Sequence, residues 1–292
     1  MFYHAGFFGQ PGSSKTTCGL SFPGVEQHVF GSSEEFTAIN FNHRKDILPI
    51  VKLDWMDFLT PEEKAKLFKD EVSDQDAEAI KKLGTARKIK KYRRYILQLK
   101  DTLKSGTRPE LKTVFLDNGT PFLEQYRDWF DVVYETKYRT AQGNYDSIKA
   151  SIDFASEVSE FLELFNSLEC HTAMSFHVQM AVDEETAAKV DFMGDAKKGI
   201  RYAKEFQPMV VGKIKYALAG KFDLAFFLAS EESPGQPNKY IAKLEADSAN
   251  VGVAKGRTQP FEKGGRIELP KGTFFDFLDS TIKKSIAGMS SK

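Results

Sequence analysis

The chain has 292 residues, of which 41% are hydrophobic and 13% aromatic, enough to bury a sizeable core. Its 41 basic and 41 acidic residues give a formal net charge of zero, which excludes a histone-like polycation and an acidic disordered tail. Two cysteines, Cys18 and Cys170, exclude a disulfide framework and favour a reducing compartment. Because the amino terminus lacks a basic signal-peptide region and no apolar stretch approaches a membrane span, we expect a soluble, cytoplasmic protein.

Apolar runs and helix-start signals give the expected order of elements along the chain. Strands are predicted at residues 2–8, 27–30, 114–117, 170–178, 222–229 and 239–244. Helices are predicted from Lys15 to Pro23, from Thr60, from Ser73 to Gly84, from about Thr85 to Lys104, from Pro121, and over residues 151–167. The pattern predicts an α/β fold with a mainly parallel sheet flanked by helices and an antiparallel C-terminal extension. We expect one domain over residues 1–292, with a helical insertion around residues 60–108.

The most informative segment is a glycine- and serine-rich loop between the first strand and the first helix. It consists of Gly9, Gln10, Pro11, Gly12, Ser13, Ser14, Lys15, Thr16 and Thr17. Such a loop can direct backbone N–H groups at a phosphate, while Lys15 reaches the β- and γ-phosphates and Thr16 binds Mg²⁺. Ser14 occupies the position that is glycine in the usual pattern, and its Cβ narrows the approach to the phosphates. The alternative interpretation is a Gly/Ser turn followed by an incidental Lys-Thr pair.

A second signal is the apolar strand Thr113-Val-Phe-Leu-Asp117, which ends in a carboxylate. Ligands of open α/β sheets bind at the carboxyl ends of the strands, and in P-loop NTPases an aspartate there holds the Mg²⁺ shell. Alone, Asp117 is typical of an ordinary strand-to-turn aspartate that caps the next helix. Together with the loop, in the correct order, it favours an NTPase that uses Thr16 and Asp117 for the metal.

The order of these motifs resembles a RecA-like P-loop ATPase, and more closely the compact phage ATPases of the AAA family that are linked to single-strand-annealing recombination. The resemblance covers most of the chain and rests on the loop, the Asp117 strand, and three weaker segments. These weaker segments are Ala173–His177, Lys255-Gly256-Arg257 and Gly264–Pro270. It implies a RecA-like core, ATP and Mg²⁺ as ligands, and ATP hydrolysis stimulated by DNA. The implied partners are single-stranded DNA, further copies of the chain in a head-to-tail ring or filament, and a single-strand-binding or annealing protein.

The resemblance also implies roles for residues further along the chain. Glu34 would orient the attacking water, with Glu35 as the alternative. His177 would sense the γ-phosphate, with Gln179 as the alternative. Arg257, near Lys255, would reach the γ-phosphate of a neighbouring subunit as an arginine finger does. The competing interpretation of Glu34 and Arg257 is ordinary surface charge.

Two basic segments are candidate DNA-binding surfaces. Residues 81–94 hold eight basic and no acidic residues, and on a helix their cations, Arg93 and Arg94 among them, are expected to project into solvent. The alternative is a solvated face balanced by the acidic segment 62–78. The second segment follows His177, where the resemblance implies contact with single-stranded DNA. Its candidate residues are Lys197, Lys198, Arg201 and Lys204.

Three functions are therefore compatible with the sequence. The leading hypothesis is an ATP-hydrolysing RecA-like protein that acts on single-stranded DNA in phage recombination or replication, in the host cytoplasm. The second is a catalytically weak, nucleotide-gated scaffold or a DNA- or protein-interaction module. A small-molecule kinase ranks last, because nothing in the sequence marks an acceptor pocket. Whether the nucleotide is ATP or GTP, and whether the assembly is a ring or a filament, is left open.

Overall fold

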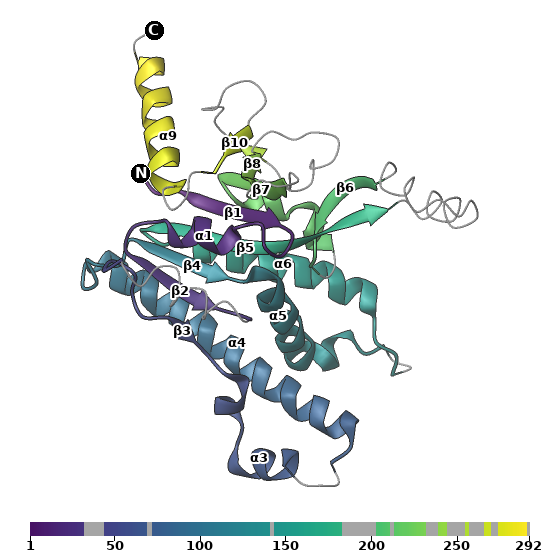
Figure 1. Ribbon diagram of the computed structural model, residues 1–292. Helices are drawn as coiled ribbons and strands as arrows, with labels where there is room; N and C mark the ends of the chain where they lie inside the picture. Colours follow the sequence, from purple (N-terminus) through teal and green to yellow (C-terminus); the bar gives the residue numbers. More distant parts are fainter. Residues whose placement is uncertain are drawn as a thin grey trace, which may run out of the picture.

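The computed structural model has a central sheet with helices packed on both faces (Figure 1). It describes residues 1–31, 44–68, 72–140, 143–182, 203–210, 213–231, 239–243, 255–256, 266–269 and 274–290. The strands are β1 (His4–Gly9), β2 (Val25–Val29), β3 (Val51–Lys52), β4 (Thr113–Asp117), β5 (His171–Val182), β6 (Ala203–Pro208), β7 (Leu224–Glu231), β8 (Lys239–Lys243), β9 (Lys255–Gly256) and β10 (Arg266–Glu268). The sequence predictions of a largely parallel α/β fold and of its main strands are confirmed.

The strand order is β10-β8-β7-β1-β5-β4-β2-β3. The strands from β7 to β3 in this order run parallel, while β8 pairs antiparallel with β7 and β10 antiparallel with β8. The antiparallel extension predicted from the turn residues between β7 and β8 is therefore confirmed. β5 continues past the sheet and pairs antiparallel with β6, and the two strands form an arm that extends away from the body (Figure 1).

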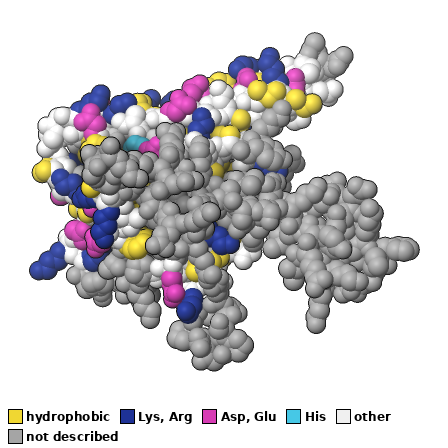
Figure 2. Space-filling model, turned by 90° about the horizontal axis from the view of Figure 1, so that it is seen from above, with side chains coloured by type: hydrophobic (Ala, Val, Ile, Leu, Met, Phe, Trp, Pro, Cys, Tyr) yellow, Lys and Arg dark blue, Asp and Glu magenta, His cyan; other side chains and the backbone are white. Residues whose placement is uncertain are grey.

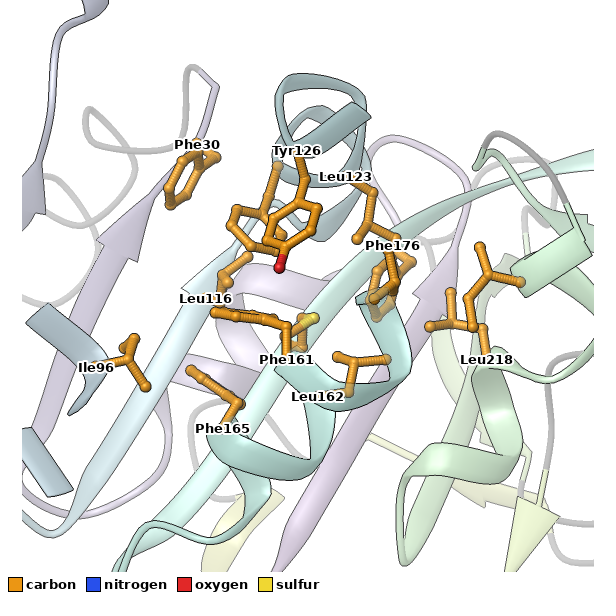
Figure 3. Close-up of a cluster of buried hydrophobic side chains, with 14 of the residues drawn as sticks. Phe30, Ile96, Leu116, Leu123, Tyr126, Phe161, Leu162, Phe165, Phe176 and Leu218 are labelled. Atoms are coloured by element: carbon orange, nitrogen blue, oxygen red, sulfur yellow. The ribbon is translucent and has the colours of Figure 1, made fainter. Parts of the chain in front are cut away.

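Alternate residues of the central strands point to opposite faces of the sheet, and each face has its own hydrophobic core. On one face the apolar side chains of the strands pack against α4 (Asp74–Lys104), α5 (Gly119–Tyr134) and α6 (Ser147–Asn166). Figure 3 shows Leu116 of β4 close to Phe161 of α6, and Phe176 of β5 beside Leu123 of α5, within this cluster. On the other face the core is completed by α1 (Lys15–Leu20) and α9 (Phe274–Ser290).

Short helical segments complete the described structure. They are η1 (Trp55–Phe58), α3 (Pro61–Leu67), η2 (Glu135–Tyr138), η4 (Lys213–Tyr216) and η5 (Leu218–Lys221). The capping box at the start of α3 is present: the Thr60 hydroxyl accepts from the Glu63 N–H, and the Glu63 carboxylate accepts from the Thr60 N–H. The helices expected around residues 60–108 lie between β3 and β4 in the chain.

One helix boundary predicted from the sequence is wrong. Gly84 does not end a helix, because α4 continues without a break from Asp74 to Lys104. A Cβ at Gly84 would lie 2.7 Å from the Trp55 carbonyl oxygen, so glycine is required there by close packing of η1 on α4 rather than by chain reversal. In α6, Ile152 is 49% exposed, because the helix turns Phe154 and Val158 toward the sheet.

Candidate functional site

The candidate site lies where the carboxyl ends of three neighbouring parallel strands meet. β5 lies between β1 and β4, and it places His177 beside Gly9 and Met174 beside Leu116. The loop after β1 and the carboxylate at the end of β4 therefore reach the same edge of the sheet, as the sequence predicts. The Thr16 hydroxyl donates a hydrogen bond to Asp117 Oδ2 at 2.9 Å. The two predicted metal-site residues are thus in direct contact, although 101 positions separate them in the chain.

The loop between β1 and α1 has a backbone shape that depends on small residues. A Cβ at Gly9 would lie 2.3 Å from the Ser13 hydroxyl and 2.5 Å from the Leu228 carbonyl oxygen, so only glycine fits. Ser14 adopts φ 66° and ψ 21°, the left-handed conformation that glycine enters at low cost and other residues rarely adopt. Ser14 therefore has the backbone conformation that explains why glycine is usual at this position.

Lys15 is folded onto the same loop and is only 6% exposed. Its ammonium donates to the carbonyl oxygens of Gly9 at 2.9 Å and Gln10 at 2.7 Å, and lies 3.4 Å from the Ser13 hydroxyl. Burial lowers the pKa of Lys15 to about 8, while the nearby Asp117 carboxylate acts in the opposite direction. The side chain is thus a desolvated cation held on the loop, close enough to Asp117 to feel its charge.

Asp117 is almost completely buried and accepts hydrogen bonds from three side chains. Besides Thr16, Gln27 Nε2 donates to Oδ2 at 2.9 Å, and the Ser175 hydroxyl donates to Oδ1 at 2.6 Å. Sequence reasoning missed Gln27 and Ser175. The signal that could have found Ser175 is a lone hydroxyl among the buried apolar residues Ala173–Phe176 of β5. Gln27 is the middle residue of β2, where Glu26 and His28 are also polar and buried, so the sequence does not single it out.

His177 is the last residue of β5 that pairs with β1, and its imidazole lies near both Lys15 and Asp117. Burial lowers the pKa of His177 below its usual value, and the Lys15 charge lowers it further, so the ring is neutral at pH 7. Within the described part of the chain, its buried Nδ1 has no hydrogen-bond partner. An unpaired buried nitrogen beside the loop is a ready contact for a ligand, such as the predicted γ-phosphate, once the proton is placed on Nδ1.

Several predicted site residues lie outside the described residues. These are Glu34, Glu35, Lys197, Lys198, Arg201 and Arg257. Lys204 is described only through its backbone, as part of β6, and Lys255 only through its backbone, as part of β9. Their predicted roles in water activation, DNA contact and subunit contact therefore stay predictions.

The basic segment 81–94 does not present all of its cations to solvent. Lys88 is 6% exposed, with its ammonium 4.6 Å from the centre of the Phe30 ring. Arg93 is paired with Glu157 of α6 and lies 4.7 Å from the centre of the Trp129 ring, whereas Arg94 is exposed. On the face in Figure 2, basic and acidic side chains of the described residues are interspersed rather than gathered in one patch of a single sign. Arg93 therefore joins α4 to α5 and α6, while the side chain of Arg94 is exposed to solvent.

The residues at this edge fit a magnesium–nucleotide complex. Hydroxyl and carboxylate oxygens are the ligands that Mg²⁺ prefers, and the ion commonly takes one or two protein oxygens plus phosphate and water oxygens. No cluster of three or more His, Cys, Asp or Glu side chains able to hold a metal occurs in the described ranges. In the same part of the chain, no helix is long and apolar enough to cross a bilayer.

Comparison with protein-family models finds no matching family, and comparison with curated proteins finds no significant match.

Proposed function

We propose that the chain binds a nucleoside triphosphate with Mg²⁺ at the edge formed by β1, β5 and β4, and hydrolyses it. The observation that carries the proposal is the 2.9 Å hydrogen bond between Thr16 and Asp117, with the Lys15 ammonium beside them. A Gly/Ser turn with an incidental Lys-Thr pair does not require a buried lysine or a carboxylate from a distant strand. The contact between the two predicted metal-site residues therefore favours the NTPase interpretation over the incidental one.

Each residue at the edge has a defined task in this proposal. Lys15 exchanges its carbonyl partners for oxygens of the β- and γ-phosphates, which satisfy a desolvated ammonium better than neutral carbonyls do. The Ser14 side chain makes no capping hydrogen bond to α1, which leaves the first N–H groups of that helix to the loop's ligand. Thr16 and Asp117 hold Mg²⁺, which when bound neutralises charge on the phosphates. His177 contacts the γ-phosphate through Nδ1.

The finer assignment is a RecA-like ATPase that acts on single-stranded DNA in phage recombination or replication. The strand order supports it, since one strand, β5, separates the loop strand from the Asp117 strand, and the part of β5 that pairs with β1 ends at His177, the residue expected to contact the γ-phosphate. In this proposal Glu34 orients the attacking water and Arg257 completes the site of a neighbouring copy. The segment assigned to DNA lies between β5 and the start of β6 in the chain.

Phosphate release measured with and without single-stranded DNA tests the proposal. Wild-type protein is expected to release phosphate from ATP, faster with DNA, and Lys15→Ala is expected to abolish this release. Lys112→Ala is the matched control, because Lys112 is an exposed lysine just before the amino end of β4, at the opposite edge of the sheet. Absence of phosphate release from wild-type protein in either condition, or equal activity of Lys15→Ala and Lys112→Ala, would refute hydrolysis at this site.

A second candidate function, a scaffold that binds nucleotide without turning it over, is favoured by one observation. Ser14 keeps a Cβ at the position nearest the phosphates, in a backbone conformation that already disfavours a side chain. Calorimetric titration with ATP and Mg²⁺ separates the two functions. Binding that Lys15→Ala removes, without phosphate release in a single-turnover assay, would identify the scaffold.

A further inference from the structure

The Asp117 carboxylate is held from both sides by the strands that flank β4. Gln27 lies on β2 and Ser175 on β5, and the sheet order places β4 between these two strands. Both donor side chains are completely buried, and Asp117 itself is 2% exposed. The two oxygens of the carboxylate are engaged separately: Oδ1 by Ser175 at 2.6 Å and Oδ2 by Gln27 at 2.9 Å.

The three side chains that donate to Asp117 belong to different kinds of secondary-structure element. Thr16 belongs to the first turn of α1, directly after the loop, and in the proposed function it would exchange Asp117 for the metal. Gln27 and Ser175 belong to interior strands that pair with a neighbouring strand on each side. The backbone that carries each of these two side chains is therefore held in place by the sheet. Their hydrogen bonds are therefore kept when Thr16 changes partner, and they fix the plane of the carboxylate with Oδ2 directed at Thr16.

Buried polar side chains on interior strands are costly unless they are hydrogen-bonded, and an apolar residue would pack at either position. Partners of a metal-site carboxylate in the outer shell commonly set its orientation, and their loss lowers metal affinity 10–100-fold. We propose that Gln27 and Ser175 are positioning residues that orient Asp117 for Mg²⁺. This inference rests on the proposed function, because it assigns the metal to the same carboxylate.

The test compares nucleotide binding with and without the metal. Fluorescent methylanthraniloyl-ATP is titrated onto the full-length protein in EDTA, and MgCl₂ is then titrated at fixed nucleotide. Gln27→Met keeps the side-chain length and removes the donor, and Ser175→Ala removes the hydroxyl. Each is expected to raise the Mg²⁺ concentration for half-saturation about tenfold or more, while the affinity in EDTA changes less than about twofold.

Thr113→Val is the matched control. Thr113 is a completely buried residue of the same strand as Asp117, and its hydroxyl donates to the Pro23 carbonyl oxygen at 2.7 Å, at the far end of that strand. It loses one buried hydrogen bond without touching the carboxylate, so its Mg²⁺ half-saturation should equal that of wild type. A purely structural role for Gln27 and Ser175 predicts that all three variants behave alike.

The possible failures are distinguishable. If wild-type protein responds to Mg²⁺ and both variants respond as Thr113→Val does, the inference is wrong and the proposed function stands. If wild-type protein binds no nucleotide with or without Mg²⁺, the proposed function falls and the inference with it. Because the two donors lie on different strands, a folding defect in one variant, seen as a lowered melting temperature in EDTA, leaves the other variant to decide.

Discussion

The buried carboxylate of Glu26 should make the stability of this fold depend on pH in a calculable way. Glu26 lies on β2 and is 4% exposed. Burial alone would raise its pKa, but hydrogen bonds from His28, Arg108 and Tyr95 outweigh burial and hold the pKa at about 2 instead of 4.5. A depressed carboxylate pKa stabilises the folded state above the unfolded-state pKa, and this stabilisation is lost as the pH falls toward the folded-state pKa.

The magnitude follows from the shift in the pKa of Glu26. A difference of about 2.5 units corresponds to about 3 kcal/mol at pH 6. At pH 3 the unfolded chain is already protonated at this position while the folded chain is not, and about 1.4 kcal/mol remains. The carboxylate should therefore contribute a loss of about 2 kcal/mol between pH 6 and pH 3.

Urea unfolding of wild-type protein and Glu26→Gln at pH 6 and pH 3 measures this contribution. The free energy of unfolding of wild type should fall by about 2 kcal/mol more than that of the variant over this interval. Other shifted carboxylates, such as Glu63 in its pair with Arg87, are present in both proteins and cancel in the difference. Equal losses in the two proteins would show that the network around Glu26 does not stabilise the ionised form.

Four further substitutions test other parts of the structure. Gly84→Ala should lower the free energy of unfolding by about 1–3 kcal/mol, because the new methyl group would meet the Trp55 carbonyl oxygen; an unchanged urea midpoint would contradict the packing of η1 on α4. Ser14→Gly should tighten ATP binding severalfold in calorimetry by removing a Cβ from a left-handed position, and weaker binding would argue against strain there. Arg93→Glu should cost about 1–3 kcal/mol of stability, whereas Arg94→Glu should change stability by less than about 0.5 kcal/mol. If Arg94→Glu leaves both the affinity for single-stranded DNA and its salt dependence unchanged, the exposed side of residues 81–94 is only a solvated face.

The features that could be predicted from the sequence are those set by local chemistry. The capping box at Thr60 and Glu63 depends on residues three positions apart, and it is present as expected. The convergence of Thr16 and Asp117 depends on a single rule, that the carboxyl ends of parallel strands meet at one edge, and therefore needs no detailed packing.

The features that could not be predicted depend on which elements become neighbours. Glycine is typical of helix ends, which is why the sequence predicts an end at Gly84. The residue is instead needed inside α4, because Trp55, 29 positions earlier in the chain, packs closely against it. Arg93 belongs to a run of cations, yet the docking of α4 on α5 and α6 pairs it with Glu157. The same holds for Gln27, which acts on Asp117 only because β2 is the strand beside β4.

The position of β5 explains why Thr16 rather than Lys15 meets the Asp117 carboxylate. Neighbouring strands lie about 4.8 Å apart, so the loop strand β1 and the carboxylate strand β4 are about 10 Å apart with β5 between them. The chain must leave β1, pass over the end of β5 and enter α1 before a side chain can reach Asp117. Lys15 therefore remains above β1 and bonds the carbonyl oxygens of Gly9 and Gln10, while the next residue completes the crossing. The strand that is crossed supplies Ser175, which donates to the carboxylate, and His177, whose ring lies near Lys15 and Asp117. The position of β5 in the sheet order therefore brings the cation, the carboxylate and the imidazole close together.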